Sequence, residues 1–432
     1  MKRKSFSTLL SLAAFSCGLT QLHAAEWNQY HGKNSDKKSP EVLTSTAWLK
    51  SKKSEAWKAS TTLGFSSFAV GGNSAFTLVG REDEDGLQRE VCIALDVKTG
   101  KEQWSAWLDR LDYGHGGGNA GASDNKGGDG PRSTPSYSNG KVYALDADFN
   151  LYCLDGKTGK ANWKKAILKE FGGKNIKWKN ASAPLIEGNM VVVGGGGSGQ
   201  SFLAFDKTNG KLIWKSGSET MTHATPVAAT IHGVRQIIFF CVSGLISVDS
   251  STGKELWRQK FRFAVSTAAA PIVAKDFVYC SAGYGVGAGL YKISKKGDQF
   301  SSQEVWRKSN DLMNHWSTPI HHEGHLYGMF GFKKYGNGPL QCVELKTGKV
   351  KWSQAGYGPG NVILVGDKLI ALSDTGELAV VEASPNGYKE HARRKVIEGK
   401  CWSTPVISDG RVFARSTKEA VCIVAQVRQG SK

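Results

Sequence analysis

The sequence lacks several features that mark common classes of protein. It has no CxxC, no CxxCH and no adjacent pair of cysteines, so cysteine-ligated zinc and attached c-type haem lose their sequence support. Beyond residues 1–25, no apolar run is long enough to span a bilayer. Helical periodicity is essentially absent, and no Pro/Ser-rich linker interrupts residues 54–432. These absences favour an all-β chain without a second domain.

What the chain does contain is a repeated ten-residue phrase. It reads LDVKTGKEQW at residues 95–104 and recurs at 154–163, 205–214, 248–257 and 343–352. A degenerate copy ends at Trp306. The Asp can accept backbone N–H bonds in a turn, and the Gly can take a positive φ. The phrase therefore predicts a β-hairpin turn with the Trp on its second strand. Self-similarity at this period indicates one stacked supersecondary unit.

A second phrase recurs in step with the first and leads into a strand. It places a proline after small or polar residues, as in RSTP and WSTP, at Pro135, Pro184, Pro226, Pro271, Pro319 and Pro405. Proline suits the first residue of a strand, where its missing N–H breaks no ladder bond. Each unit then reads as four antiparallel strands, from the proline-led strand to the Trp strand.

The count of units predicts an eight-bladed β-propeller. Six units carry a Trp, a seventh spans residues 360–396 without one, and an eighth begins at Trp402 and lacks its fourth strand. The missing strand is found at the other end of the chain, in SEAWKAS at residues 54–60. An N-terminal strand that completes the last blade closes the ring and removes its exposed edges.

The first residues have the pattern of a targeting segment. Lys2, Arg3 and Lys4 precede an apolar stretch and a plausible cleavage site, so we expect a signal peptide at 1–25, an extension at 26–53 and the propeller at 54–432. Cys17 leaves lipidation open as an alternative, although AFSC lacks the expected Leu. We expect an exported monomer without a transmembrane span, periplasmic or extracellular in a bacterium.

Two cysteine and glycine patterns favour plain structural roles. Four cysteines occupy the same third-strand slot of different blades, which is too far apart for disulfides, so we expect buried apolar residues: Cys92, Cys153, Cys342 and Cys422. The glycines of 194–199 match GxGxxG, but a strand follows them instead of the helix that nucleotide binding needs.

The loop 113–131 is long, and the side-chain oxygens of Asp124, Asn125 and Asp129 are weak candidate ligands for Ca²⁺. The alternative is that this loop packs as a lid without a metal ion.

The residues before the proline-led strands are the candidate ligand-binding residues. The innermost strand of each blade lines the channel of a propeller, so these side chains should converge on one mouth: Arg132, Asn180, His223, Ser266, His315, Trp316, Asn361 and Trp402. Such a ring could hold an anionic or polar ligand. The alternative is that they bond loop backbones and pack between blades. We predict no catalytic residue and no metal ligand set among them.

The net charge of +18 suggests an anionic partner. Five lysines follow the turn glycine of the repeat and should form a ring on the face opposite the proline-led mouth: Lys101, Lys160, Lys211, Lys254 and Lys349. This ring could bind an acidic polymer such as an anionic envelope polysaccharide, or its lysines could simply be solvated. Export argues against nucleic acid as the natural partner.

The repeats LDxxTGKxxW and xTPxx resemble the PQQ-like (quinoprotein alcohol dehydrogenase-like) propeller repeat family over nearly all of residues 54–427. NKGGDGPRSTP, at 125–135, also looks like exported PQQ-like propellers of planctomycete-type bacteria. The resemblance implies the propeller fold and two classes of function. One is a scaffold similar to the periplasmic scaffold of outer-membrane barrel assembly, and the other is a quinone-dependent dehydrogenase with PQQ and Ca²⁺ in the channel.

This chain departs from the dehydrogenase pattern, which has an acidic calcium ligand, a catalytic Asp and commonly adjacent cysteines. None of the candidate mouth positions is acidic. We therefore expect a non-catalytic binding or scaffold module, without a cofactor, for an envelope protein or anionic polymer. The alternative is a PQQ-dependent alcohol dehydrogenase of the polyvinyl alcohol type, and a glycan- or polymer-degrading enzyme is a third hypothesis.

Overall fold

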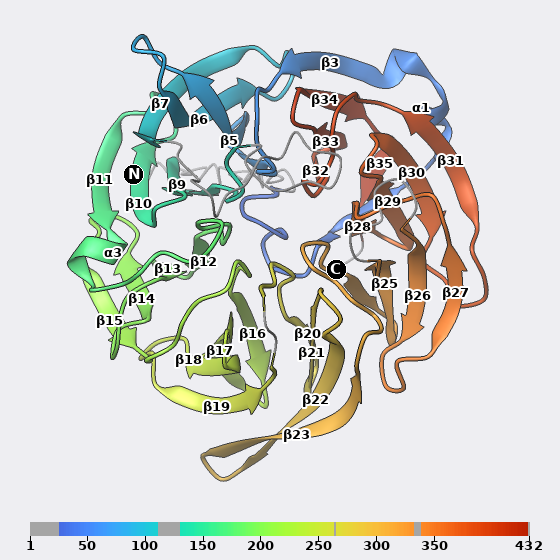
Figure 1. The fold of residues 1–432 in the computed structure, drawn as a ribbon. Coiled ribbons are helices and arrows are strands. Elements are labelled where there is room, and N and C mark those ends of the chain that lie inside the picture. The colour runs from blue at the N-terminus through green and yellow to red at the C-terminus, as the bar shows by residue number, and fades with distance from the viewer. Residues whose placement is uncertain (1–25, 111–129, 263–264, 332–337, 431–432) are drawn as a thin grey trace, which may run out of the picture.

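The computed structural model describes residues 26–110, 130–262, 265–331 and 338–430. Eight four-stranded antiparallel sheets stand around a central axis as the blades of a ring (Figure 1). The predicted eight-bladed β-propeller is thus confirmed. Within the described ranges, no helix has the length and apolar character needed to cross a membrane.

The strands of each blade follow one another in sequence from the channel outward. Blades one and two comprise β4 (Ala69–Gly71), β5 (Ser74–Glu82), β6 (Gln88–Asp96), β7 (Glu102–Arg110), β8 (Ser136–Ser138), β9 (Lys141–Leu145), β10 (Asn150–Asp155) and β11 (Ala161–Ala166). Blades three and four comprise β12 (Leu185–Glu187), β13 (Met190–Gly194), β14 (Phe202–Asp206), β15 (Leu212–Ser216), β16 (Val227–Ile231), β17 (Val234–Cys241), β18 (Gly244–Asp249) and β19 (Glu255–Lys260).

The other four blades repeat this order, and the last takes its outermost strand from the N-terminal part of the chain. Blades five and six comprise β20 (Ile272–Ala274), β21 (Phe277–Ala282), β22 (Gly287–Lys296), β23 (Gln299–Lys308), β24 (Ile320–His322), β25 (His325–Met329), β26 (Leu340–Glu344) and β27 (Val350–Gln354). Blades seven and eight comprise β28 (Asn361–Val365), β29 (Lys368–Leu372), β30 (Glu377–Glu382), β31 (Glu390–Lys395), β32 (Val406–Ser408), β33 (Arg411–Arg415), β34 (Glu419–Val424) and β3 (Glu55–Ser60).

Short elements complete the described chain. They are β1 (Lys38–Ser39), β2 (Glu41–Leu43), β35 (Val427–Gln429), the helices α1 (Ala47–Lys50) and α3 (Ile167–Glu170), and the 3₁₀ turn η1 (Lys52–Ser54). Each repeat proline stands directly before its innermost strand and not at the first strand residue, as Pro135 does before β8. As predicted, the glycines of 194–199 belong to the connection between the strands β13 and β14.

The repeated Trp packs on the turn of the following blade, which explains why the two features recur together. A Cβ added to Gly159 would come within 2.6 Å of the Trp104 indole, whose Nε1 donates to the Gly156 carbonyl at 3.1 Å. The same contact joins Trp57 to Gly100, Trp163 to Gly210 and Trp214 to Gly253. These four glycines have φ between +70° and +72°. Glycine is therefore needed both for the turn conformation and for the space under the indole.

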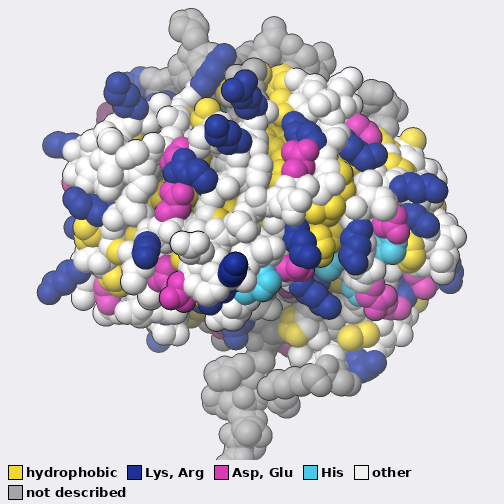
Figure 2. Space-filling view, turned by 90° about the horizontal axis from the view of Figure 1, so that it is seen from below, with side chains coloured by type: hydrophobic (Ala, Val, Ile, Leu, Met, Phe, Trp, Pro, Cys, Tyr) yellow, Lys and Arg dark blue, Asp and Glu magenta, His cyan; other side chains and the backbone are white. Residues whose placement is uncertain are grey.

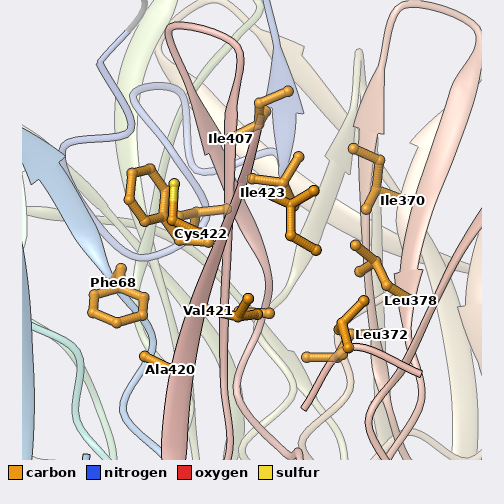
Figure 3. Packing of buried hydrophobic residues seen from close by; sticks show 14 of the residues in the cluster. Phe68, Ile370, Leu372, Leu378, Ile407, Ala420, Val421, Cys422 and Ile423 are labelled. Carbon is orange, nitrogen blue, oxygen red and sulfur yellow. The ribbon is translucent and has the colours of Figure 1, made fainter. Parts of the chain in front are cut away.

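The ring closes through the N-terminal strand, as predicted. β3 pairs antiparallel with β34, and Trp57 donates from Nε1 to the Val97 carbonyl of blade one at 3.1 Å. The core at this junction is continuous across three blades. In Figure 3 the strand residues Ala420–Ile423 lie between Phe68, which precedes blade one, and residues of blade seven. The labelled blade-seven residues are Ile370, Leu372 and Leu378.

The segment before β3 crosses the centre of the ring (Figure 1). It contacts the inner strands of several blades: the Trp27 carbonyl accepts from Val70, and the Asn28 carbonyl accepts from Tyr137, both at 2.7 Å. β1 then pairs in parallel with β28, placing a fifth strand inside blade seven. The extension at 26–53, to which the sequence assigned no role, therefore fills part of the channel.

The seven cysteines in the described ranges are buried and free, as expected for Cys92, Cys153, Cys342 and Cys422. The predicted signal peptide at 1–25, including Cys17, lies outside the described residues. So do residues 113–129 of the long loop, and with them Asp124, Asn125 and Asp129.

Candidate functional site

The predicted mouth residues lie at one end of the channel because all eight innermost strands run in the same direction. The residues that precede these strands are consequently brought together. By their side-chain contacts they form two groups, one at blades two to five and one at blades six to eight.

The first group holds the backbone of residues 177–180. Arg132 donates from Nη1 to the Trp178 carbonyl at 2.7 Å, and the Nε2 of His223 lies 2.9 Å from the Lys177 carbonyl. Asn180 is buried and donates from Nδ2 to the carbonyls of Asp146, at 3.2 Å, and Ser182, at 3.0 Å. These contacts tie the side chains to a connecting segment, which is the arrangement given above as the alternative to ligand binding.

His223 is held neutral at physiological pH. Burial first, and then the nearby Arg132 guanidinium, lower its pKa to about 4. Its Nδ1 is hydrogen-bonded to the Ser266 hydroxyl, so both ring nitrogens have partners. A neutral, doubly bonded imidazole cannot supply a positive charge to an anion.

The second group is a row of aromatic rings from the starts of blades six, eight and one, extended by Tyr284 from blade five. Trp402 stacks on Trp316 with ring centroids 4.2 Å apart and on Phe65 with centroids 5.0 Å apart. His315 meets Trp316 edge-on at 5.0 Å, and Tyr284 meets His315 edge-on at 5.1 Å. We call Phe65, Trp402, Trp316, His315 and Tyr284 the aromatic row. Its first four members are half-buried and Tyr284 is exposed, so the rings keep surface in contact with solvent.

Hydrogen bonds fix part of this row. Trp316 donates from Nε1 to the Pro359 carbonyl at 3.0 Å, and Asn361 donates from Nδ2 to the Trp402 carbonyl at 2.9 Å. Among the described residues, neither the buried Nε1 of Trp402 nor the buried Oδ1 of Asn361 has a hydrogen-bond partner. The Lys400 ammonium lies 5.0 Å from the Trp402 ring centroid, within range of a cation–π interaction.

Phe65 was missed because its unit has no proline. The stretch FSSF at 65–68 takes the place of WSTP at 402–405, and the pairing of Phe65 with Trp402 shows the equivalence. The signal was present in the sequence, since an aromatic residue followed by two hydroxyl residues precedes the first strand of blade one. Tyr284 had no such signal, because it lies in the connection between β21 and β22.

The inside of the channel contains the chain's own residues 26–39, which contact the inner strands of several blades. Lys37 is 1% exposed and donates from Nζ to the Thr318 carbonyl at 2.5 Å. Burial lowers the pKa of this ammonium to about 7. The five repeat lysines are exposed in the turns between third and fourth strands, as their spacing predicts: Lys101, Lys160, Lys211, Lys254 and Lys349.

The described residues contain no group of three or more His, Cys, Asp or Glu side chains that could hold a metal ion. The acidic side chain Asp146, near the first group, has a structural role. It accepts from the backbone N–H groups of Asp148 and Asn150 at 2.9 and 2.7 Å, and burial raises its pKa to about 6.

Comparison with known proteins gives matches over most of the ring. A family model described as outer membrane protein assembly factor BamB matches residues 88–354. BamB of Shewanella oneidensis is 22% identical over 294 residues, which is 64% of this chain and 70% of that protein. Tetrathionate hydrolase of Acidithiobacillus ferrooxidans is 24% identical over 263 residues, 61% of this chain; the match spans only 44% of the hydrolase.

Among solved structures, the quinohemoprotein alcohol dehydrogenase of Comamonas testosteroni superposes with a TM-score of 0.65 at 13% identity. The superposition covers 94% of this chain and 82% of that protein. At this level of identity the likeness concerns the fold alone.

Proposed function

Because the chain belongs to the outer membrane protein assembly factor BamB family of β-propellers, we propose that it is an exported binding or scaffold module of the bacterial cell envelope. In this proposal the protein binds an envelope protein or an anionic envelope polymer and does not catalyse a reaction. The observation that supports it best is the aromatic row at the proline-led mouth.

The row has the physical properties of a contact site. Aromatic side chains offer a large apolar area with few rotatable bonds, so they lose little entropy on binding, and they are enriched among residues that dominate binding energy. Trp316 and Trp402 stand at the starts of innermost strands and stack on each other, which limits their movement. A rigid, half-buried aromatic surface of this kind suits an apolar side chain of a partner protein.

The first group at the same mouth has a supporting role in this proposal. Arg132, Asn180 and His223 hold residues 177–180 in place beside the channel. Because their polar atoms already bond to the protein, we assign the ligand contacts to Trp316 and Trp402 before these three residues. Arg132 is the charged residue of the three.

A quinone-dependent alcohol dehydrogenase is the second candidate, and one observation favours it. The Trp316–Trp402 stack presents a planar surface at the channel mouth, which a planar cofactor such as PQQ could cover. The test is to add PQQ and Ca²⁺ to the purified protein and follow absorbance and alcohol-dependent reduction of a dye. We expect no dye reduction; stoichiometric quinone uptake with alcohol-dependent reduction would replace the scaffold proposal.

The binding proposal is tested with immobilised protein and solubilised envelope proteins. We expect a defined set of proteins to bind to the wild type and to be lost from the variant W316A/W402A. The control is W107A, which removes a Trp that is 48% exposed on β7, away from the mouth. If W316A/W402A and W107A bind the same envelope proteins to the same extent, the aromatic row is not the binding site.

A further inference from the structure

A cleft opens where the N-terminal segment lies against the inner strands of blades four, five and six. Its volume is about 280 Å³, and its lining includes residues 34–38 of the N-terminal segment, residues 227–230 of β16 and His321 of β24. This size is near the lower end of the roughly 300–1,000 Å³ range of small-molecule sites. None of the aromatic-row residues lines this cleft, but Pro271, Thr318 and Pro319, at the starts of innermost strands, do.

The described lining is strongly basic. Lys37, Lys38, Lys275 and Arg235 contribute positive charge, and Asp36 is the one acidic residue. Arg235 is already neutralised by Glu187, with two contacts of 2.7 Å. Within the described residues, no carboxylate lies within ion-pair distance of Lys38 or Lys275, and the Asp36 carboxylate acts on Lys38 only at longer range.

Both lysines act on the same histidine. His321 lines the cleft, and its pKa is lowered to about 4 by burial first and then by the charges of Lys38, His322, His325 and Lys275. Lys38 and Lys275, from two distant parts of the sequence, thus line the same cleft as His321 and both act on it.

A buried polar atom inside the lining also lacks a partner. His31 is 2% exposed, and its Nε2 has no hydrogen-bond partner among the described residues. The ring is held by stacking on Tyr30, with centroids 3.8 Å apart. A buried polar atom without a hydrogen bond lowers the stability of the folded state. A bound ligand or a water molecule at this position would supply the missing bond.

We propose that this cleft is a binding site for a tetrahedral oxyanion, a phosphate or sulfate group, held by Lys38 and Lys275 with Lys37, His31 and His321 around it. On the side of the molecule that Figure 2 shows, Lys and Arg are spread out and interleaved with Asp and Glu, so that side offers only general attraction to an anion. The cleft instead gathers Lys38, Lys275 and a buried, unpartnered nitrogen of His31 around one space, where charge-assisted hydrogen bonds can hold an oxyanion.

The oxyanion has two sources with the same chemistry: the free ion, or a monoester group on an envelope sugar. Isothermal titration with inorganic phosphate and, separately, with glucose 6-phosphate distinguishes them. We expect one saturable site for phosphate. A glucose 6-phosphate affinity about tenfold higher assigns the site to a sugar-borne group, and an equal or lower affinity assigns it to the free ion; both outcomes support the site.

The decisive variant is K38Q/K275Q, and the matched control is K211Q/K349Q. Both remove two exposed or half-buried lysines, and the control takes them from the repeat turns. We expect the first to weaken phosphate binding at least about tenfold and the second to change it less than about twofold. Absence of saturation up to roughly 10 mM phosphate, or equal losses in the two variants, would overturn the proposal. W316A/W402A should bind phosphate normally, so failure here is separate from failure of the envelope-binding proposal.

Discussion

The mouth and the inside of the central channel use their residues in different ways. At the proline-led mouth, side chains from before the innermost strands either hold a connecting segment, as Arg132 and His223 do, or form the half-buried aromatic row. Inside the channel, the chain's own residues 26–39 lie against the inner strands, and Lys37 is buried there. The N-terminal segment therefore fills the channel, while the aromatic row keeps surface in contact with solvent and is the part proposed to contact a partner.

Deletion of residues 26–60 should have the largest effect, because it removes both the segment inside the channel and β3. Blade eight then exposes the edge of β34, and we expect loss of the folded monomer or a fall of more than about 5 kcal/mol in the free energy of unfolding. Thermal melting and gel filtration measure this. A shorter deletion of 26–43 keeps β3 and should cost less. An unchanged melting midpoint in a monomeric 26–60 deletion contradicts the closure.

Replacement of Trp57 by Ala should be the next largest change. This indole is 7% exposed and packs on Gly100 of the next blade, so truncation leaves a cavity and should cost about 3–5 kcal/mol. Trp107 is the matched control, since it is 48% exposed on β7 and W107A should cost less than about 1 kcal/mol. Urea denaturation measures the loss of stability in each variant. Equal losses would contradict the prediction that Trp57 stabilises the contact between blades eight and one.

The channel interior and the mouth should also respond to different ranges of pH. Lys37 has a folded pKa of about 7 against 10.5 when unfolded, so the unfolded state holds an extra proton between these values. Stability relative to K37M should therefore rise with pH from about 7 to 10.5, by at most about 1.4 kcal/mol per pH unit. His223 has a folded pKa of about 4 against 6.5, so relative to H223Q stability should fall as pH drops from 6.5 to 4.

Denaturation of both variants and the wild type across these ranges measures the two slopes. A wild-type curve parallel to that of K37M between pH 7 and 10.5 would mean that Lys37 is not held in an apolar site. A curve parallel to that of H223Q between pH 4 and 6.5 would mean the same for His223.

The repeat lysines should give the smallest effect. Changing all five to Gln (Lys101, Lys160, Lys211, Lys254 and Lys349) should lower the salt concentration that elutes the protein from a polyanion column. The contribution should fade as the Debye length falls from roughly 30 Å at 0.01 M to 8 Å at 0.15 M salt. An unchanged elution salt would show that these turns take no part in polymer binding.

The repeats predicted the ring well because each blade carries its own local signal. The turn Asp, the turn Gly and the Trp mark the third and fourth strands, and the missing fourth strand of blade eight pointed to residues 54–60. The partner of each Trp could not be predicted in this way. Trp104 contacts Gly159 in the next blade, a contact set by the packing of two blades and not by the sequence near either residue.

The candidate site was predicted less completely. The sequence placed Trp316 and Trp402 at one mouth, but it could not separate them from His223, whose bonds to Ser266 and Lys177 depend on neighbouring blades. The path of residues 26–39 and the cleft beside them were not predictable, because this segment has no repeat with which to align. Its place is fixed by long-range contacts such as that of Lys37 with Thr318.

The claim that the proline-led mouth is the working face can be tested in the cell by site-specific photo-cross-linking. A photoreactive amino acid replaces Trp316 in one strain and Trp107, on the outer wall, in another. The proposed function predicts a discrete cross-linked envelope partner from position 316 that is absent from position 107. The same cross-linked products from both positions, or none from position 316 in a folded protein, would contradict it.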